Sequence, residues 1–138
     1  MKLDHLAIAV SDLDAAMVFY RDALGLAVQR VEDVPHEGVR TAFLPLGESH
    51  IELVQPIRAD TGLVKWMAKR GGGMHHICLA VDDIEATLAR LVAHGCELIN
   101  PTPATRDDGT RYAFIHPRSA FGVLVELYEV PTPSPPER

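Results

Sequence analysis

The chain has 138 residues, 47% of them hydrophobic, and a formal net charge of −6. This length and composition suit one folded domain with a hydrophobic core and argue against a disordered chain. No block of Lys and Arg stands out and no apolar run reaches membrane-spanning length, so neither a nucleic-acid partner nor a membrane span is expected. The two cysteines require no disulfide framework, and we expect a reducing, cytoplasmic location.

The first half of the chain predicts one strand, one helix and three further strands. Residues 4–10 alternate between small and large side chains, which is typical of a strand. A helix is expected to begin at Ser11, an N-cap with Asp14 three residues on, and to end before Gly25. Strands are expected at about 27–34, 40–46 and 50–55.

The second half predicts the same order of elements. A linker over 57–73, with a helix at 60–70, leads to a strand at 74–81. A helix capped by Asp82, with Glu85 at its third position, then runs to His94. Strands follow at about 97–100, 110–116 and 122–129. We therefore expect a single domain over residues 1–129, with modules at about 2–56 and 74–129, and a disordered Pro-rich tail at 130–138.

The two halves repeat one another in sequence. Residues 5–13 read HLAIAVSDL and residues 76–84 read HICLAVDDI, and RTAFL at 40–44 matches RYAFI at 111–115 at the same offset. A later match follows a short loop slip, with IELV at 51–54 and VELY at 125–128. Four matches in the same order indicate a duplication. The fold class is therefore α+β, with two tandem βαβββ modules forming a curved mixed sheet around a metal-containing cavity.

Four side chains at matching positions of the repeat are candidate metal ligands: His5, Glu52, His76 and Glu126. Strand alternation puts each histidine on a face of small residues and turns the large aliphatics toward the helix of its module. Each glutamate lies between aliphatics, where a carboxylate is costly unless it is paired, hydrogen-bonded or metal-bound. Two imidazoles and two carboxylates suit one ion of Zn, Mn, Fe, Co or Ni. A lone strand His or Glu is usually structural, and the matched recurrence favours the metal site.

Several motifs carry a resemblance to a known family: DHLAIAV, HIELVQP, GGGMHHICLAV and HPRSAFGVLVEL. They resemble the glyoxalase-like vicinal oxygen chelate superfamily and, within it, the methylmalonyl-CoA epimerase family. The resemblance implies the same four ligands, one divalent metal ion with cobalt favoured, an acyl-CoA thioester substrate and a homodimer. It also implies that the (R) and (S) epimers of methylmalonyl-CoA interconvert by removal of the C2 proton through a metal-stabilised enolate.

The chain departs from the family pattern at one catalytic position. A glutamate of the family lies in a strand reading GVxE, whereas residues 38–41 here read GVRT, so Thr41 stands where that carboxylate is expected. Glu126 is the first candidate proton carrier, because a ligand carboxylate keeps a second oxygen near the substrate. The second carrier is open among Glu52, His116 and a metal-bound water.

Substrate contacts are less specific in the sequence. Arg118 and Ser119, before the last strand, are candidates to bind the substrate carboxylate, and Lys65 is a candidate for the CoA phosphates. Each also fits an ordinary solvated surface. Three alternative functions stay open: a glyoxalase I-type isomerase with the same ligands, an Fe(II) dioxygenase with two histidines and one carboxylate, and a non-catalytic small-molecule-binding protein of the same fold.

Overall fold

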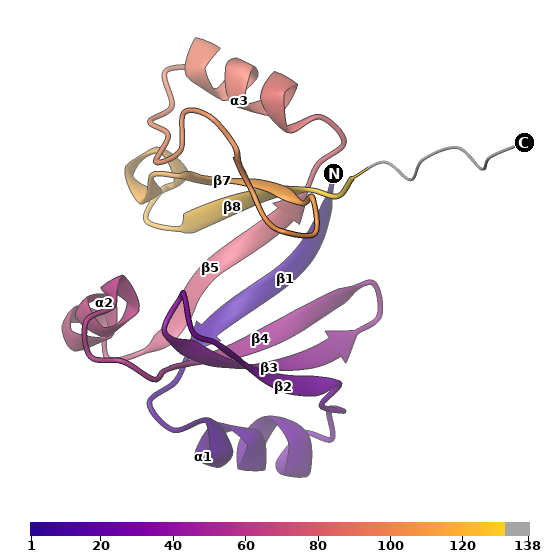
Figure 1. The fold of residues 1–138 in the computed structure, drawn as a ribbon, viewed down its shortest axis with the longest axis vertical. Coiled ribbons are helices and arrows are strands. Elements are labelled where there is room, and N and C mark those ends of the chain that lie inside the picture. Colours follow the sequence, from indigo (N-terminus) through magenta and orange to yellow (C-terminus); the bar gives the residue numbers. More distant parts are fainter. Residues whose placement is uncertain (132–138) are drawn as a thin grey trace, which may run out of the picture. The chain divides into compact units, whose positions relative to one another are not determined.

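The computed structural model describes residues 1–131 (Figure 1). These residues divide into two compact units: one is Asp4–Ile77, and the other joins Met1–Leu3 to the residues from Cys78 onward. Most of the proposed Pro-rich tail, residues 132–138, lies outside the described residues. The single-domain interpretation of residues 1–129 stays a prediction.

The Asp4–Ile77 unit carries the first module and the linker helix. Its strands β1 (Lys2–Ala9), β2 (Arg30–Val34), β3 (Val39–Leu46) and β4 (Ser49–Pro56) are hydrogen-bonded in the order β2-β3-β4-β1, and β1 borders the start of β5 (Gly73–Ala80). Strand β4 runs parallel to β1 and antiparallel to β3. Helix α1 (Leu13–Met17) continues into a π-helical turn, η1 (Val18–Ala23), and α2 (Gly62–Arg70) precedes β5.

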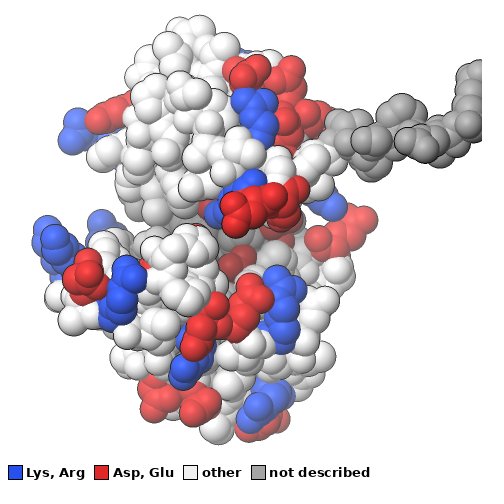
Figure 2. All heavy atoms as spheres, in the orientation of Figure 1, with Lys and Arg blue, Asp and Glu red and all other residues white. Residues whose placement is uncertain are grey.

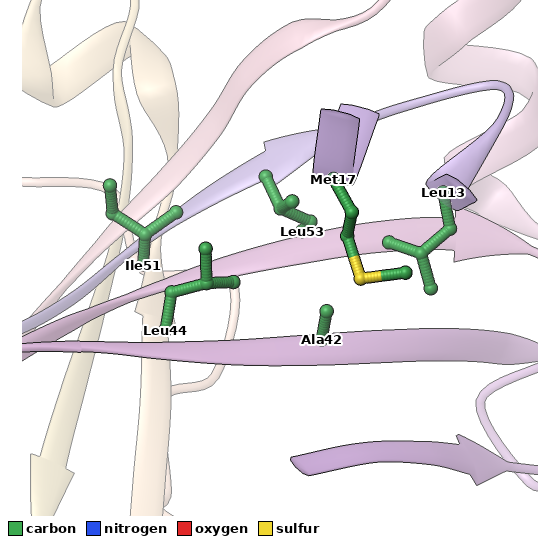
Figure 3. Packing of buried hydrophobic residues seen from close by; sticks show 6 residues of the cluster. All are labelled: Leu13, Met17, Ala42, Leu44, Ile51 and Leu53. Carbon is green, nitrogen blue, oxygen red and sulfur yellow. The ribbon is translucent and has the colours of Figure 1, made fainter. Parts of the chain in front are cut away.

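Helix α1 packs on β3 and β4 through a cluster of buried apolar side chains (Figure 3): Leu13, Met17, Ala42, Leu44, Ile51 and Leu53. Ile8 of β1 and Val10 just after it pack against this cluster. The prediction that the large aliphatics of the first strand face the helix of their module is therefore confirmed for these two residues. The opposite face of β1 is left to His5, Ala7 and Ala9.

The other unit repeats this order of elements. The end of β5 is followed by α3 (Ile84–Ala93), β6 (Ala104–Thr105), β7 (Arg111–Ile115), the 3-10 turn η2 (Pro117–Ala120) and β8 (Leu124–Glu129), with strand order β5-β8-β7-β6. Figure 1 shows α3 lying beside β7 and β8. The buried side chains of this unit include Ile84 and Leu88 on α3, Ala113 on β7, and Val125 and Leu127 on β8. The α+β class and the duplicated module are confirmed.

Both module helices begin one residue later than the predicted N-caps. Asp12, rather than Ser11, accepts the backbone N–H of Ala15, and Asp83, rather than Asp82, accepts that of Ala86. Asp12 and Asp83 occupy equivalent positions of the repeat, so the duplication conserves the carboxylate that satisfies the first turn. The linker helix begins after Thr61, whose side chain accepts the N–H of Val64.

The predicted strand at 97–100 is wrong. This segment makes one isolated bridge, between Leu98 and Ile115, and regular pairing resumes only at β6. Pro101 and Pro103 follow the bridge, and each lacks the backbone N–H that a continuing ladder needs. The second module therefore has a shorter first edge strand than the sequence pattern predicts.

Charged side chains of both signs are interspersed on the face drawn in Figure 2. Among residues 1–131, no helix combines the length and the apolar character needed to cross a membrane. Cys78 is buried, Cys96 is half-buried, and neither forms a disulfide.

Truncation of Leu44 is expected to destabilise the fold far more than truncation of Leu46 on the same strand. Leu44 is fully buried in the α1 cluster, whereas Leu46 is 42% exposed. Leu44→Ala should lower the free energy of unfolding by about 2–5 kcal/mol, and Leu46→Ala by less than about 1 kcal/mol. Urea denaturation of the two variants measures this difference, and equal losses would contradict the packing described for β3.

Candidate metal centre

Three of the four predicted ligands come together in the Asp4–Ile77 unit. His5 on β1 places its Nε2 atom 3.0 Å from Oε2 of Glu52 on β4 and 3.2 Å from Nε2 of His76 on β5. His5 is 5% exposed, and the other two side chains are half-buried. Atoms that bind one tetrahedral ion at about 2.0–2.1 Å lie about 3.3 Å apart, so this spacing suits a common ion.

The Nδ1 atoms of His5 and His76, on the far side of each ring from Nε2, also have hydrogen-bond partners. His5 Nδ1 lies 2.8 Å from Oδ2 of Asp4, and His76 Nδ1 lies 2.8 Å from Nδ1 of His75. Because a carboxylate only accepts, His5 donates its Nδ1–H to Asp4; its Nε2 then donates to Glu52 when the ring is protonated in the metal-free protein, or offers its lone pair to an ion bound between it and Glu52. When His76 donates to His75 in the same way, its Nε2 lone pair faces His5. Two nitrogen lone pairs and a carboxylate oxygen then converge, and this donor set fits a divalent transition-metal ion.

The electrostatics of the cluster keep its carboxylates ionised. Burial alone would raise the pKa of Glu52, but hydrogen bonds from His5 and His50, together with the positive charge of these rings when they are protonated, outweigh it and lower the pKa to about 2. The hydrogen bond to His5 also lowers the pKa of Asp4. Burial lowers the pKa of His75, which favours its neutral form. An ionised carboxylate beside several imidazole nitrogens is suited to a cation.

His50, Asp4 and His75 take part in the cluster and were missed as site residues by the sequence pattern. His50 Nε2 lies 2.9 Å from Oε2 of Glu52, and its ring centroid lies 4.9 Å from that of His5. Its position two residues before Glu52 on one strand was the available signal, since alternation puts both on one face. His75 directly precedes His76 on β5, so strand alternation starts its side chain on the opposite face. Its ring instead packs edge-on against Trp66, with centroids 4.9 Å apart, and supports His76.

Two further predicted site residues are Glu126, the remaining ligand candidate, and Lys65, the candidate for the CoA phosphates. Glu126 on β8 belongs to the other unit and is 2% exposed. Within this unit, Nη2 of Arg106 lies 3.7 Å from Oε2 of Glu126. Lys65 is exposed on α2. The ligand role of Glu126 and the phosphate role of Lys65 both stay predictions.

His116, Arg118 and Ser119 form a small local network at η2. His116 caps this turn, because its Nδ1 accepts the backbone N–H of Arg118 at 2.9 Å. The Arg118 guanidinium lies 3.3 Å from the Glu97 carboxylate, and Ser119 Oγ accepts the Glu97 N–H at 2.8 Å. These contacts give all three residues structural partners, while their catalytic and substrate-binding roles stay predictions.

Comparison with known proteins gives first the class and then the family. A family model for the Glyoxalase/Bleomycin resistance protein/Dioxygenase superfamily matches residues 4–114. The mitochondrial methylmalonyl-CoA epimerase of Mus musculus is 38% identical over 91% of this chain and 71% of its own length. The ethylmalonyl-CoA/methylmalonyl-CoA epimerase of Cereibacter sphaeroides is 38% identical over 94% of this chain and 98% of its own.

A solved structure of a methylmalonyl-CoA epimerase is also similar to this chain. A variant of Streptomyces coelicolor methylmalonyl-CoA epimerase in complex with 2-nitronate-propionyl-CoA is 35% identical, with a TM-score of 0.83 and 99% of both chains covered. The chain therefore belongs to the methylmalonyl-CoA epimerase family, and the resemblance seen in its motifs is confirmed.

The hydrogen bonds to Glu52 predict a pH-dependent stability for the metal-free protein. Because folding lowers the pKa of Glu52 from 4.5 to about 2, its contribution to stability is present above the unfolded pKa and is lost as the pH falls through this window. In urea denaturation, the stability difference between wild type and Glu52→Gln should shrink as the pH falls to about 3. A stability difference between the two proteins that stays the same at every pH would contradict the hydrogen bonds from His5 and His50 to Glu52.

Removal of the carboxylate behind His5 is expected to weaken metal binding without removing a ligand. Asp4→Asn should raise the dissociation constant for Co²⁺ or Zn²⁺ by about 10-fold or more, because a partner that fixes a ligand ring typically contributes 10–100-fold. Asp33→Asn is the matched control, since Asp33 pairs with Arg40 on the exposed β2–β3 edge. Isothermal titration calorimetry measures both, and equal affinities for the two variants would contradict the orienting role of Asp4.

Proposed function

We propose that this chain is a metal-dependent epimerase that interconverts (R)- and (S)-methylmalonyl-CoA. The observation that carries the proposal is the convergence of His5, Glu52 and His76 in a chain of this family. One divalent ion is expected there; the resemblance favours cobalt, and the donor set also fits Mn, Zn or Ni. Glu126 is proposed as the fourth ligand on the sequence repeat alone. The resemblance is likewise the basis for proposing a homodimer, and a cytoplasmic location stays a prediction.

The substrate proposed has an acidic hydrogen at C2, between a thioester carbonyl and a carboxylate. Its removal gives an enolate, and returning the proton to the opposite face inverts the centre. A divalent ion held by these ligands would supply Lewis-acid stabilisation for the negative charge on the substrate oxygens. Asp4 and His75 keep the His5 and His76 rings oriented, so that the site is arranged before the substrate binds.

The two repeated glutamates are proposed to have different roles. A proton carrier works best when its pKa lies near the working pH. With a pKa of about 2, Glu52 stays ionised near neutral pH, which suits a ligand better than a base. Proton transfer on one face is therefore assigned to Glu126. Thr41 supplies no carboxylate, so His116 or a metal-bound water is proposed to carry the proton on the other face.

Hydrogen exchange at C2 tests this proposal. One epimer of methylmalonyl-CoA, incubated with the metal-loaded chain in D₂O, should take up deuterium at C2 while its stereochemistry scrambles. Glu126→Gln should slow exchange by about 10²–10⁴-fold, the usual contribution of a positioned proton carrier. Glu85→Gln is the control, since the Glu85 side chain is 68% exposed and pairs with Arg111.

Two outcomes would count against the epimerase. No exchange by wild type with any of the candidate metals would overturn it. Turnover of a glutathione hemithioacetal in place of methylmalonyl-CoA would favour the glyoxalase I-type alternative.

A further inference from the structure

Arg106 lies in a tight turn between β6 and β7, and the proposed function assigns this residue no role. Its backbone N–H donates to the Thr110 carbonyl at 2.8 Å, and its carbonyl accepts the Gly109 N–H at 2.9 Å. These two bonds close the turn and fix the backbone from which the Arg106 side chain extends. The turn brings this side chain over β7 and β8.

The strand face under Arg106 is aromatic and carries Glu126. Tyr112 pairs with Tyr128 across β7 and β8, and Phe114 pairs with Glu126, so alternation puts all four on one face. The Arg106 guanidinium carbon lies 4.4 Å from the Tyr112 ring centroid and 5.7 Å from that of Tyr128. The two rings support the cation beside the carboxylate through cation–π contacts.

The contact between Arg106 and Glu126 is a loose ion pair. Its 3.7 Å separation exceeds the roughly 2.7–2.9 Å of a charge-assisted hydrogen bond. The Arg106 side chain is 37% exposed, whereas that of Glu126 is 3% exposed, so solvent or a ligand reaches part of the Arg106 side chain. A guanidinium has five N–H donors in a planar fork that matches the two oxygens of a carboxylate.

We propose that Arg106 determines substrate specificity by binding the free carboxylate of the acyl group. The inference rests on the proposed function, in which Glu126 acts at C2. That carboxylate is bonded directly to C2, so the group that binds it must lie beside the proton carrier, as Arg106 does. The CoA phosphates lie many bonds away from C2 and are not the anions expected here. Arg118, the earlier candidate, is 77% exposed and pairs with Glu97.

The test compares two ligands that differ in this carboxylate. Binding of methylmalonyl-CoA and of propionyl-CoA to the metal-loaded full chain is measured by calorimetry for wild type, Arg106→Gln and Arg106→Lys. Arg106→Gln should weaken methylmalonyl-CoA binding by about 10–100-fold, since hydrogen bonds to charged groups are the strong ones. Propionyl-CoA binding should change less than about twofold. Arg106→Lys, which keeps the charge and loses the fork, should fall between the two.

Arg111→Gln is the matched control, because Arg111 lies one residue before Tyr112 on β7 and pairs instead with Glu85 and Glu129. It removes the same charge and should leave the preference for methylmalonyl-CoA unchanged. Equal weakening of both ligands by Arg106→Gln would indicate a phosphate contact and overturn the proposal, as would an unchanged preference.

Failure of the proposed function gives a different result. Suppose the wild-type chain exchanges no C2 hydrogen, but its preference for methylmalonyl-CoA depends on Arg106. The epimerase proposal is then wrong, and the proposal that Arg106 binds the carboxylate stands. Suppose instead that the wild-type chain epimerises methylmalonyl-CoA and the Arg106→Gln variant still prefers methylmalonyl-CoA. The proposal for Arg106 is then wrong, and the epimerase proposal stands.

Discussion

The convergence of two imidazole nitrogens and one carboxylate oxygen is the arrangement on which this account depends. His5 and His76 lie on neighbouring strands, and their Nε2 atoms are 3.2 Å apart, with Glu52 Oε2 3.0 Å from that of His5. Asp4 and His75 bind the Nδ1 atoms and fix which nitrogen faces inward. The apolar cluster under α1 holds β3 and β4, and so sets the position of Glu52 relative to β1.

Duplication supplies equivalent residues, and their surroundings make them different. Glu52 and Glu126 occupy matching positions of the repeat, yet Glu52 accepts from two histidines whereas Glu126 lies on an aromatic face beside Arg106. Hydrogen bonds hold the pKa of Glu52 near 2, which favours a permanently ionised ligand. A symmetric sequence pattern thus supports an asymmetric division of work between a ligand and a proposed proton carrier.

Much of the fold followed from the sequence, because periodicity and repetition report which face a residue occupies. They predicted the module order and the packing of Ile8 and Val10 toward the helix of their module. They also predicted four candidate metal ligands, three of which, His5, Glu52 and His76, lie together in the structure. What they missed depends on local geometry: the capping residues, the proline-limited segment at 97–100, and partners set by rotamers or turns. Three of those partners, Asp4, His75 and Arg106, contact a neighbour in sequence or lie in a loop, where no period applies.

The most direct test of the central claim is X-ray absorption spectroscopy of the cobalt-loaded chain. The account predicts two imidazole nitrogens in the first coordination shell, with the remaining light scatterers being carboxylate or solvent oxygens. His5→Ala and His76→Ala should each remove one imidazole from the spectrum, if the ion is retained, or abolish stoichiometric binding. A shell without imidazole scattering, or one that is unchanged by both substitutions, would contradict it.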